Sequence, residues 1–272
     1  MTTVTVKAAQ ETVTVDYSVG SPPAYPDATT TGARGTLTNY TGNMRPTANG
    51  LVFQNLRFTD GDLILTGSGH TFRNCEFISN SYWPLRFDSE TGVQSIIEDC
   101  TFKTGPTSQC GMGGSNFAIR RCDISGPADG IKGFNNVLIE DNYVHDLYGE
   151  AGSHRDGIDC EGTLNITIRH NTVLMPTSDT SCITVARYTN NGQYTFNNCL
   201  VENNLLAGAG YCIYGPGTNA PTPTNVRIIN NKFWKKYYPK YGYWGWMAYE
   251  PPTPGNGNII SGNVDYITGL AL

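Results

Sequence analysis

The chain has 272 residues, a formal net charge of −5, 31 glycines, 15 prolines and only 15% charged residues. This composition favours turns and strands over long helices, and the acidic balance argues against nucleic acid as the main partner. No stretch resembles a membrane-spanning segment, so membrane insertion is not expected either.

Residues 1–50 precede a series of repeats and are predicted to form an N-terminal capping segment. Thr and Val alternate over residues 2–19, and Ser21-Pro-Pro-Ala-Tyr-Pro-Asp27 ends that alternation. A stack of strands needs a cover on its first strand, because an open edge pairs with other chains. Docking to a larger assembly is the alternative use of this segment. The N-terminus lacks the basic start and the apolar run of a signal peptide, so export by that route is not expected.

From residue 51 onwards, one eight-residue pattern occurs nine times, with an apolar third position and Asn or Cys at nearly every sixth position. The copies begin at Leu51, His70, Ser95, Phe117, Val137, Ile166, Cys199, Val226 and Asn258. The sixth positions lie 19 to 33 residues apart, and no helical stretch separates the copies. Self-similarity at this period predicts an all-β fold, a parallel β-solenoid of about nine coils over residues 51–272.

Each coil of such a solenoid lies about 4.8 Å above the previous one, so equivalent residues stack. The sixth positions are therefore predicted to form inward columns, of amides at Asn142, Asn171, Asn204 and Asn231 and of small thiols at Cys75, Cys100 and Cys122. Stacked cysteines are close enough to bridge. Because no secretory signal supports an oxidising route, we expect the eight cysteines to be reduced. The absence of a Cys-x-x-Cys pair and the four scattered histidines argue against a zinc site.

A second series of strands follows the repeats, in segments such as Leu85-Arg-Phe87, Gly130-Ile-Lys132 and Cys212-Ile-Tyr214. If the apolar residues point inward, alternation places a polar column on one outer face, formed by Arg86, Lys132, Asp159, Thr184 and Tyr214. This column is the predicted ligand groove. The alternative is a solvated sheet face with a Lys132–Asp159 ion pair worth under about 1 kcal/mol.

The tripeptide Asp-Gly-Ile begins at Asp129 and again at Asp156, one coil apart. The two carboxylates are predicted to lie about 5 Å apart and to titrate as a pair. A retaining glycosidase separates its nucleophile and its acid by about 5 Å as well. Alternatively, each Asp caps its turn by accepting backbone N–H bonds.

The segment Asp146-Leu-Tyr-Gly-Glu-Ala-Gly-Ser-His-Arg-Asp156 is expected to form a Gly-rich loop beside this face. Loops on a rigid scaffold often carry function. His154 would act as general acid or base, and Arg155 would neutralise a carboxylate or an oxyanion. The alternative is a surface loop in which these two residues pair with Asp146 or Glu150.

Residues 233–249 carry nine aromatic residues and three lysines. Aromatic rings stack on the apolar faces of sugars, and their OH and NH groups bond hydroxyls, so the segment is a second candidate for glycan binding. The alternative is an insert that packs over the sheet or serves a subunit contact.

The repeat resembles the right-handed parallel β-helix of the pectin-lyase-like superfamily over roughly residues 50 to 265. Within it, His154-Arg-Asp-Gly-Ile-Asp159 resembles the Asn-Thr-Asp-Gly-Ile-Asp motif of the polygalacturonase family. Asp179-Thr-Ser-Cys-Ile-Thr184 lies where that family has Gly-Asp-Asp-Cys-Ile-Ala, and Gly210-Tyr-Cys-Ile-Tyr214 lies where it has Gly-His-Gly-Ile-Ser. The framework of the two sequences therefore agrees.

The chemistry of the motif differs from that family. Asp156 matches the first catalytic Asp, but Thr180 and Ser181 replace the following pair and Tyr211 replaces the His. The Arg-x-Lys substrate clamp has no counterpart. An inverting hydrolase without its Asp pair cannot both protonate the leaving oxygen and activate water, so polygalacturonase activity is not expected.

The superfamily also contains calcium-dependent lyases and uronate epimerases, and many phage tail proteins resemble this fold and hold host-surface glycan with it. We therefore predict a carbohydrate-recognising β-helix of a phage tail or similar extracellular assembly, located in the virion or outside the cell. Its expected partner is a polysaccharide, and a homotrimer or larger virion assembly is its expected state. A structural solenoid that spaces other modules is a further interpretation.

The alternative function is a polysaccharide lyase, an epimerase or an atypical glycoside hydrolase acting at the face of Asp129, Asp156 and Asp159. Only a lyase would require calcium, and no other cofactor or metal is expected. The candidate catalytic residues are Lys132, His154, Arg155, Asp156 and Asp159. The candidate substrate-binding residues are Arg86, Asp129, Glu161, Arg187, Tyr211, Tyr214, Trp234, Trp244 and Trp246.

Overall fold

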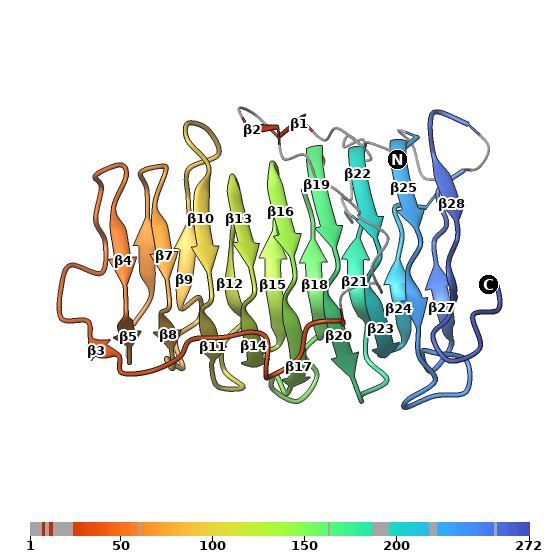
Figure 1. Ribbon diagram of the computed structural model, residues 1–272, viewed down its shortest axis with the longest axis horizontal. Helices are drawn as coiled ribbons and strands as arrows, with labels where there is room; N and C mark the ends of the chain where they lie inside the picture. Colours follow the sequence, from red (N-terminus) through yellow and green to blue (C-terminus); the bar gives the residue numbers. More distant parts are fainter. Residues whose placement is uncertain are drawn as a thin grey trace.

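The computed structural model describes residues 24–59, 61–162, 164–186, 196–217, 222–252 and 255–272. It also describes two short strands near the N-terminus, β1 (Lys7–Ala8) and β2 (Glu11–Thr12), which pair antiparallel. All other strands belong to three parallel sheets of nine, ten and eight strands (Figure 1). Among the described residues, no helix is long and apolar enough to cross a membrane.

The three sheets share one construction, in which neighbouring strands come from successive coils. Sheet 1 consists of β4 (Val52–Gln54), β7 (Thr71–Arg73), β10 (Ser95–Glu98), β13 (Phe117–Arg120), β16 (Val137–Glu140), β19 (Leu164–Arg169), β22 (Asn197–Glu202), β25 (Thr224–Ile229) and β28 (Ile259–Ser261). Sheet 2 consists of β3 (Thr38–Asn39), β5 (Leu56–Phe58), β8 (Glu76–Phe77), β11 (Thr101–Lys103), β14 (Asp123–Gly126), β17 (Tyr143–Leu147), β20 (Thr172–Met175), β23 (Leu205–Gly208), β26 (Lys232–Phe233) and β29 (Val264–Asp265). Sheet 3 consists of β6 (Leu63–Leu65), β9 (Leu85–Phe87), β12 (Cys110–Gly114), β15 (Asp129–Gly133), β18 (Asp156–Cys160), β21 (Ser181–Val185), β24 (Tyr211–Tyr214) and β27 (Gly245–Ala248).

Each of the first eight coils passes through sheet 1, sheet 2 and sheet 3 in that order, and the ninth supplies β28 and β29. Every predicted repeat therefore supplies the sheet 1 and sheet 2 strands of one coil. Equivalent residues pair in register, as Ile119 does with Ile139. The inward residues of successive coils therefore stack, and the rings of Phe58, Phe77 and Phe102 follow one another at 4.5 and 4.7 Å between centroids. The prediction of a right-handed parallel β-helix is confirmed.

The predicted amide ladder at the bend between sheets 1 and 2 is also confirmed. The backbone N–H and the Nδ2 of Asn142 donate to Oδ1 of Asn171 at 2.9 and 3.0 Å. Asn171 donates in the same way to Asn204, and Asn204 to Asn231. All four side chains are fully buried, so each amide satisfies polar groups that would otherwise be buried without partners.

The residue before each ladder position adopts a positive φ, which turns the chain sharply from sheet 1 into sheet 2. These residues are Asn55, Asn74, Asp99, Arg121, Asp141, His170, Asn203, Asn230 and Gly262. Asn, Asp and His tolerate this left-handed conformation better than other side chains, which explains the composition of the fifth repeat position. Earlier along the helix the ladder position is Cys75, Cys100 and Cys122, and all eight cysteines of the chain are buried free thiols.

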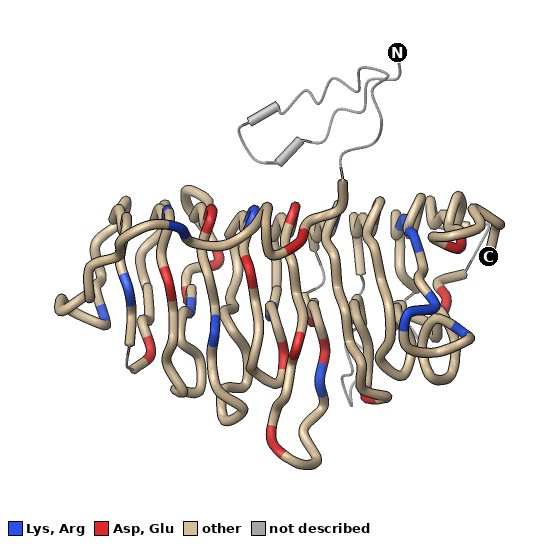
Figure 2. The backbone as a smooth tube through the Cα atoms, turned by 60° about the horizontal axis from the view of Figure 1, so that its bottom comes forward, with Lys and Arg blue, Asp and Glu red and all other residues tan. Residues whose placement is uncertain are grey.

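The described N-terminal segment lies along the outside of this bend. Tyr25 donates its hydroxyl to Oδ1 of Asn203 at 2.9 Å, and the N–H of Gly32 donates to the carbonyl of Arg121 at 2.9 Å. β3 then pairs with β5 of the first coil. The segment therefore crosses most of the solenoid before it reaches the first coil, as Figures 1 and 2 show. β3 covers the edge of sheet 2 as a cap would, while a docking role for residues 1–50 stays a prediction.

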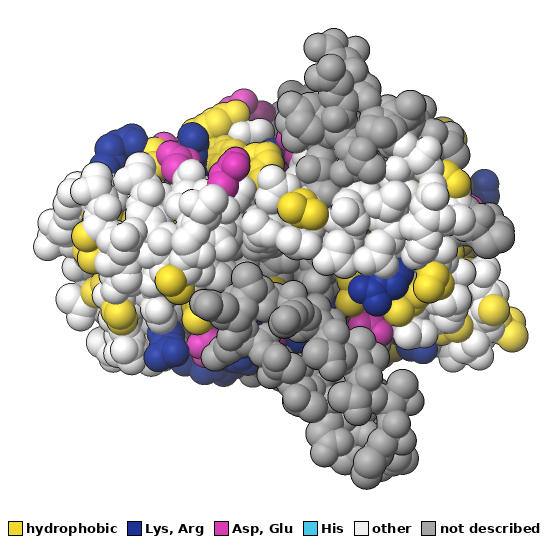
Figure 3. All heavy atoms as spheres, turned by 90° about the horizontal axis from the view of Figure 1, so that it is seen from above, with side chains coloured by type: hydrophobic (Ala, Val, Ile, Leu, Met, Phe, Trp, Pro, Cys, Tyr) yellow, Lys and Arg dark blue, Asp and Glu magenta, His cyan; other side chains and the backbone are white. Residues whose placement is uncertain are grey.

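Ion pairs between coils follow the same stacking. Arg120 Nε lies 3.0 Å from Glu140 Oε2 of the next coil, and Arg57 Nε lies 2.5 Å from Glu76 Oε2. On the face shown in Figure 3, basic side chains accordingly lie next to acidic ones. Because such pairs lie at the surface and are only partly buried, each contributes about 1 kcal/mol or less, and the buried columns carry most of the stability.

Candidate functional site

The outer face of sheet 3 carries two polar columns instead of the single one that alternation predicts. In β15, both Gly130 and Ile131 face the interior. A Cβ on Gly130 would lie 2.7 Å from the buried Val144 side chain and 2.3 Å from the carbonyl oxygen of Gly157. Two consecutive inward residues shift the phase of the strand, so Asp129 and Lys132 both face outward. Only glycine tolerates this approach of the next coil, which explains the Asp-Gly-Ile sequence.

The same phase shift recurs in the next coils, so the two columns run along the helix. Asp156 pairs in register with Ser181, and Ser181 with Tyr211. In the second column the pairs are Lys132 with Asp159, Asp159 with Thr184 and Thr184 with Tyr214. The prediction that this second column faces outward is confirmed.

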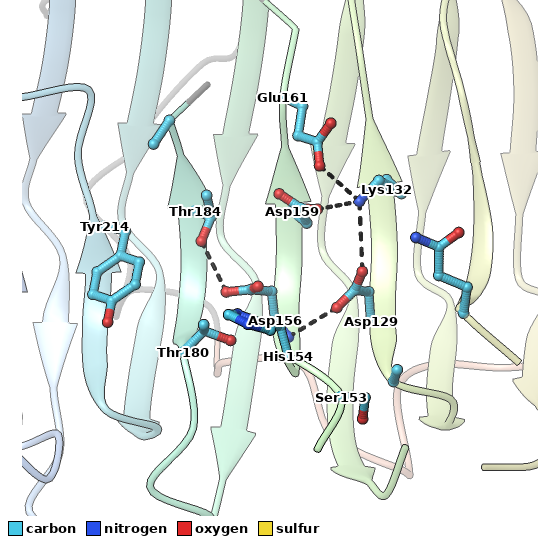
Figure 4. A pocket seen from close by; sticks show the side chains of 13 residues that line it. Asp129, Lys132, Ser153, His154, Asp156, Asp159, Glu161, Thr180, Thr184 and Tyr214 are labelled. Atoms are coloured by element: carbon cyan, nitrogen blue, oxygen red, sulfur yellow. Dashed lines mark hydrogen bonds and ion pairs between the residues drawn. The ribbon is translucent and has the colours of Figure 1, made fainter. Parts of the chain in front are cut away.

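A hollow of about 610 Å³ lies over these columns (Figure 4). It is lined by Gln109, Ala128, Asp129, Lys132, Ser153, His154, Asp156, Asp159, Glu161, Thr180, Thr184, Ala186 and Tyr214. The strands β15, β18, β21 and β24 supply its floor, and the loop before β18 supplies Ser153 and His154. Seven of the predicted site residues therefore meet in one place: Asp129, Lys132, His154, Asp156, Asp159, Glu161 and Tyr214.

Lys132 is the centre of a buried ionic cluster. Its Nζ lies 2.5 Å from Asp159 Oδ2, 2.9 Å from Glu161 Oε1 and 3.6 Å from Asp129 Oδ2. The Lys132 side chain is only 9% exposed. The Lys132–Asp159 pair expected from the sequence is present, but it is buried, so the small energy of a surface pair does not describe it.

Asp156 lies in a different environment, surrounded by hydroxyl groups. Its Oδ1 accepts hydrogen bonds from Ser181 Oγ at 2.6 Å and from Thr184 Oγ1 at 2.8 Å. Its backbone N–H donates to Oδ1 of Asp129 at 3.1 Å. Asp129 and Asp156 are thus neighbours on adjacent coils, as predicted, and the carboxylate of Asp129 caps the start of the next strand as in the alternative interpretation.

Burial is the largest influence on the titration of these carboxyls. It raises the pKa of Asp129 to about 8, with the charges of Asp159 and Asp156 acting in the same direction and Lys132 opposing them. It raises the pKa of Asp159 to about 7 against the attraction of Lys132. Burial also raises the pKa of Asp156, against the hydrogen bonds from its hydroxyl partners. For Lys132, burial alone would lower the pKa, but the neighbouring carboxylates raise it.

The two loop residues predicted to be catalytic separate in the structure. His154 lines the hollow from the loop before β18 (Figure 4). Arg155 does not line it: the guanidinium pairs with Asp179 and donates to the carbonyl of Tyr148 at 2.8 Å. The alternative prediction that Arg155 pairs with Asp146 or Glu150 is therefore wrong, because its guanidinium pairs with Asp179 of the following coil.

Of the remaining predicted binding residues, those that the structure describes lie outside the hollow. Arg86 pairs with Asp88 on the same outer face, and the ring of Tyr211 lies 5.5 Å from that of Tyr214. The three tryptophans of the late aromatic segment are dispersed: Trp246 packs against Phe233 of the core at 5.2 Å, Trp234 contacts Tyr266 at 5.7 Å, and Trp244 is 60% exposed. Arg187 lies outside the described residues.

Sequence reasoning missed β12 and therefore Gln109, which precedes it. The strand reads Cys110-Gly-Met-Gly-Gly114, and its small residues hide the alternation that identifies its neighbours. Ser153 was likewise not singled out from its loop. The register of Cys110 with Asp129 is the signal that could have placed Gln109 beside the carboxylate cluster.

The described residues contain no group of three or more His, Cys, Asp or Glu side chains that could hold a metal ion. The four carboxyls of the hollow instead share one ammonium group and several hydroxyls. Such an arrangement can give and take protons, and it can hydrogen-bond a polar ligand.

Three comparisons with known proteins were made for the whole chain. Residues 39–191 match the family model described as right handed beta helix region. No match is found among curated proteins, and none among solved structures.

Proposed function

Because the chain belongs to the right-handed β-helix family, we propose that it binds a polysaccharide on the outer face of sheet 3 and hydrolyses it between Asp129 and Asp156. One observation carries this proposal: two carboxyls on adjacent coils line an open hollow in different environments. Titratable neighbours whose environments differ in this way are typical of an acid and its partner in glycoside hydrolysis.

Asp129 is the proposed general acid. With a pKa of about 8 it holds its proton at neutral pH and can give it to the glycosidic oxygen as the bond to the sugar breaks. Asp156 is the proposed nucleophile: burial raises its pKa, but the hydrogen bonds from Ser181 and Thr184 oppose this shift and favour the ionised form. The coil spacing of about 4.8 Å matches the separation of about 5 Å in retaining enzymes. In the second step, water gives a proton to Asp129 and its oxygen replaces Asp156 on the sugar.

The substrate we propose is a neutral glycan. Lys132 is the one Lys or Arg side chain among the described residues that line the hollow, and the carboxyl groups of Asp129, Asp159 and Glu161 already surround it. No further Lys or Arg of this described lining is left to neutralise the carboxylate of a uronate, which a lyase or an epimerase requires. An acidic polymer would also be repelled by the carboxyls of the hollow that are ionised.

Recognition without cleavage is the second candidate. Thr180 and Ser181 stand where the polygalacturonase family has its Asp pair, and the Ser181 hydroxyl is engaged with Asp156. In this case the chain would hold a host-surface glycan as part of a phage tail or a similar extracellular assembly, in a homotrimer or larger complex. The resemblance of the repeat to such tail proteins supports this setting, and light scattering of the purified protein tests the trimer.

Incubation with neutral and acidic polysaccharides tests the proposal. We expect new reducing ends from a neutral polymer, retention of configuration in the first product by NMR, and loss of both in Asp156→Asn. Asp99→Asn is the matched control, because Asp99 pairs with Arg121 at another bend of the solenoid. Retention of glycan without new reducing ends would favour the second candidate. Absorbance from unsaturated uronate would refute hydrolysis in favour of a lyase.

A further inference from the structure

An aromatic side chain outside the hollow adjoins its end nearest the first coils. Trp83 precedes β9, and its ring lies over β12 of the next coil: a Cβ on Gly113 would lie 3.1 Å from Trp83 Cζ3. The ring is half-buried and lies 6.4 Å from that of Phe134, with 15° between the planes. Trp83 therefore rests on the same outer face as the carboxylate cluster.

Polar contacts fix the position of this ring. Its Nε1 donates to Oε1 of Gln109 at 2.6 Å, and the Trp83 backbone N–H donates to Oδ1 of Asp62 at 3.0 Å. Gln109 itself lines the hollow. Since the Gln109 oxygen accepts from the indole, its amide nitrogen is oriented as a donor for another partner. The indole and the hollow are thus joined through one side chain.

The cation beside the Trp83 ring is already paired. The guanidinium carbon of Arg86 lies 5.2 Å from the ring centroid, and Arg86 is paired with Asp88. Gly113, between Arg86 and Lys132 in the second column, has no side chain that would stand between the ring and the hollow. A flat apolar ring with a hydrogen-bond donor beside it and its neighbouring cation already paired is the kind of surface on which a neutral sugar ring stacks.

We propose that Trp83 and Gln109 form a further subsite, which binds a neutral sugar unit of the chain whose next units lie over Asp129 and Asp156. This inference rests on the proposed function and deepens it. At the opposite end of the hollow, Tyr214 lies 5.5 Å from Tyr211 and 5.6 Å from Tyr249 between ring centroids. From β9 to β24 the sheet spans five strand spacings, about 24 Å. The substrate therefore lies parallel to the helix axis, and the site takes the interior of a polymer.

Binding of oligosaccharides of increasing length tests this subsite. The probes are ladders of neutral glucan, galactan, mannan and xylan oligosaccharides, from disaccharides upward, with affinity measured by calorimetry. We expect Trp83→Ala to weaken the longer members of the bound ladder about 5- to 10-fold and to leave the shortest bound members unchanged. Trp83→Leu keeps an apolar side chain over Gly113, so it gives the same result if the alanine variant does not fold. Tyr82→Ala, which removes an exposed ring from the same loop, should have no effect.

The possible results separate the subsite from the function on which it rests. Unchanged affinity of Trp83→Leu for every length would overturn the subsite while the wild-type binding upheld the proposed function. An equal loss at every length would also overturn it, because the ring would then act on the central hollow or on the fold. If the wild-type protein bound none of the ladders, the proposed function would fail and the subsite with it.

Discussion

Replacing Asp129 by Asn separates the catalytic role of this carboxyl from its effect on stability. Asp129 is only 6% exposed, and its carboxyl accepts a hydrogen bond from the backbone N–H of Asp156. The charges of Asp156 and Asp159 lie nearby. An Asn keeps the carbonyl oxygen that accepts this hydrogen bond and cannot ionise. The substitution therefore removes a proton donor and, at high pH, a buried charge.

The pKa of Asp129 sets the sign and the size of the stability change. Between about pH 4 and pH 8 the native state holds a proton that the unfolded chain has released, because the pKa rises from 3.8 to about 8 on folding. Wild-type stability thus falls as the pH rises through this window, and the Asn variant lacks this loss. The full pKa difference corresponds to about 6 kcal/mol at pH 9. We expect Asp129→Asn to be more stable than the wild type by about 2 to 5 kcal/mol at pH 9, because side chains rearrange around the ionised carboxyl and reduce its cost. At pH 4 the difference in free energy of unfolding should be about zero.

Urea unfolding of both proteins at a series of pH values between 4 and 9 measures this difference. Activity toward the polysaccharide should fall at least about 100-fold in Asp129→Asn, as expected for loss of a general acid. Asp99→Asn controls for a carboxyl that is exposed and salt-bridged. The reasoning is refuted if the free-energy difference between wild type and Asp129→Asn stays constant with pH, or if the Asn variant is the less stable protein at pH 9.

Four further results are expected. Asn171→Ala should lower the free energy of unfolding by about 3 kcal/mol in urea, because the N–H of Asn142 loses its buried acceptor. Gly157→Ala should cost more than about 2 kcal/mol, since the added Cβ would lie 2.3 Å from Val173 Cγ1. Lys132→Met should destabilise by about 3 kcal/mol at pH 8 and clearly less at pH 5, where the neighbouring carboxyls take up protons, as measured by urea unfolding at both pH values. Chelation with EDTA should leave the release of reducing ends unchanged, whereas a calcium requirement would contradict the proposed hydrolysis.

The fold was predictable because every coil repeats the same arrangement of strands and bends. A column position must suit the same neighbours in every coil, so its residue type recurs at Asn142, Asn171 and Asn204, and the recurrence is visible without coordinates. The left-handed bend residues recur just as regularly, but their conformation was not predicted, because Asn, Asp and His at the fifth position look like ordinary surface residues. Their common property is a backbone conformation, which the side-chain pattern alone does not display.

The course of the N-terminal segment was less predictable. Its contacts with Asn203 and Arg121 join positions far apart in the sequence, and they depend on single hydrogen bonds of a non-repeating stretch. The same reason applies to Arg155, whose partner Asp179 comes from the next coil. Contacts between coils are predictable at repeated positions, and contacts made by the inserts between strands are not.

The density of the carboxylate cluster follows from a break in the pattern that predicted the strands. Residues three apart on a regular strand face opposite sides. Yet Asp129 and Lys132 share one face, with 3.6 Å between Asp129 Oδ2 and Lys132 Nζ. Gly130 and Ile131 both face inward, which shifts the alternation by one residue, so the strand presents two outward polar groups close together. The break recurs two coils later, where the hydroxyls of Ser181 and Thr184 lie 2.6 Å apart. Strict alternation therefore finds one column of this site, and the second requires recognising that two consecutive inward residues, Gly-Ile in β15 and β18 and Cys-Ile in β21, leave the residues on both sides of them facing outward.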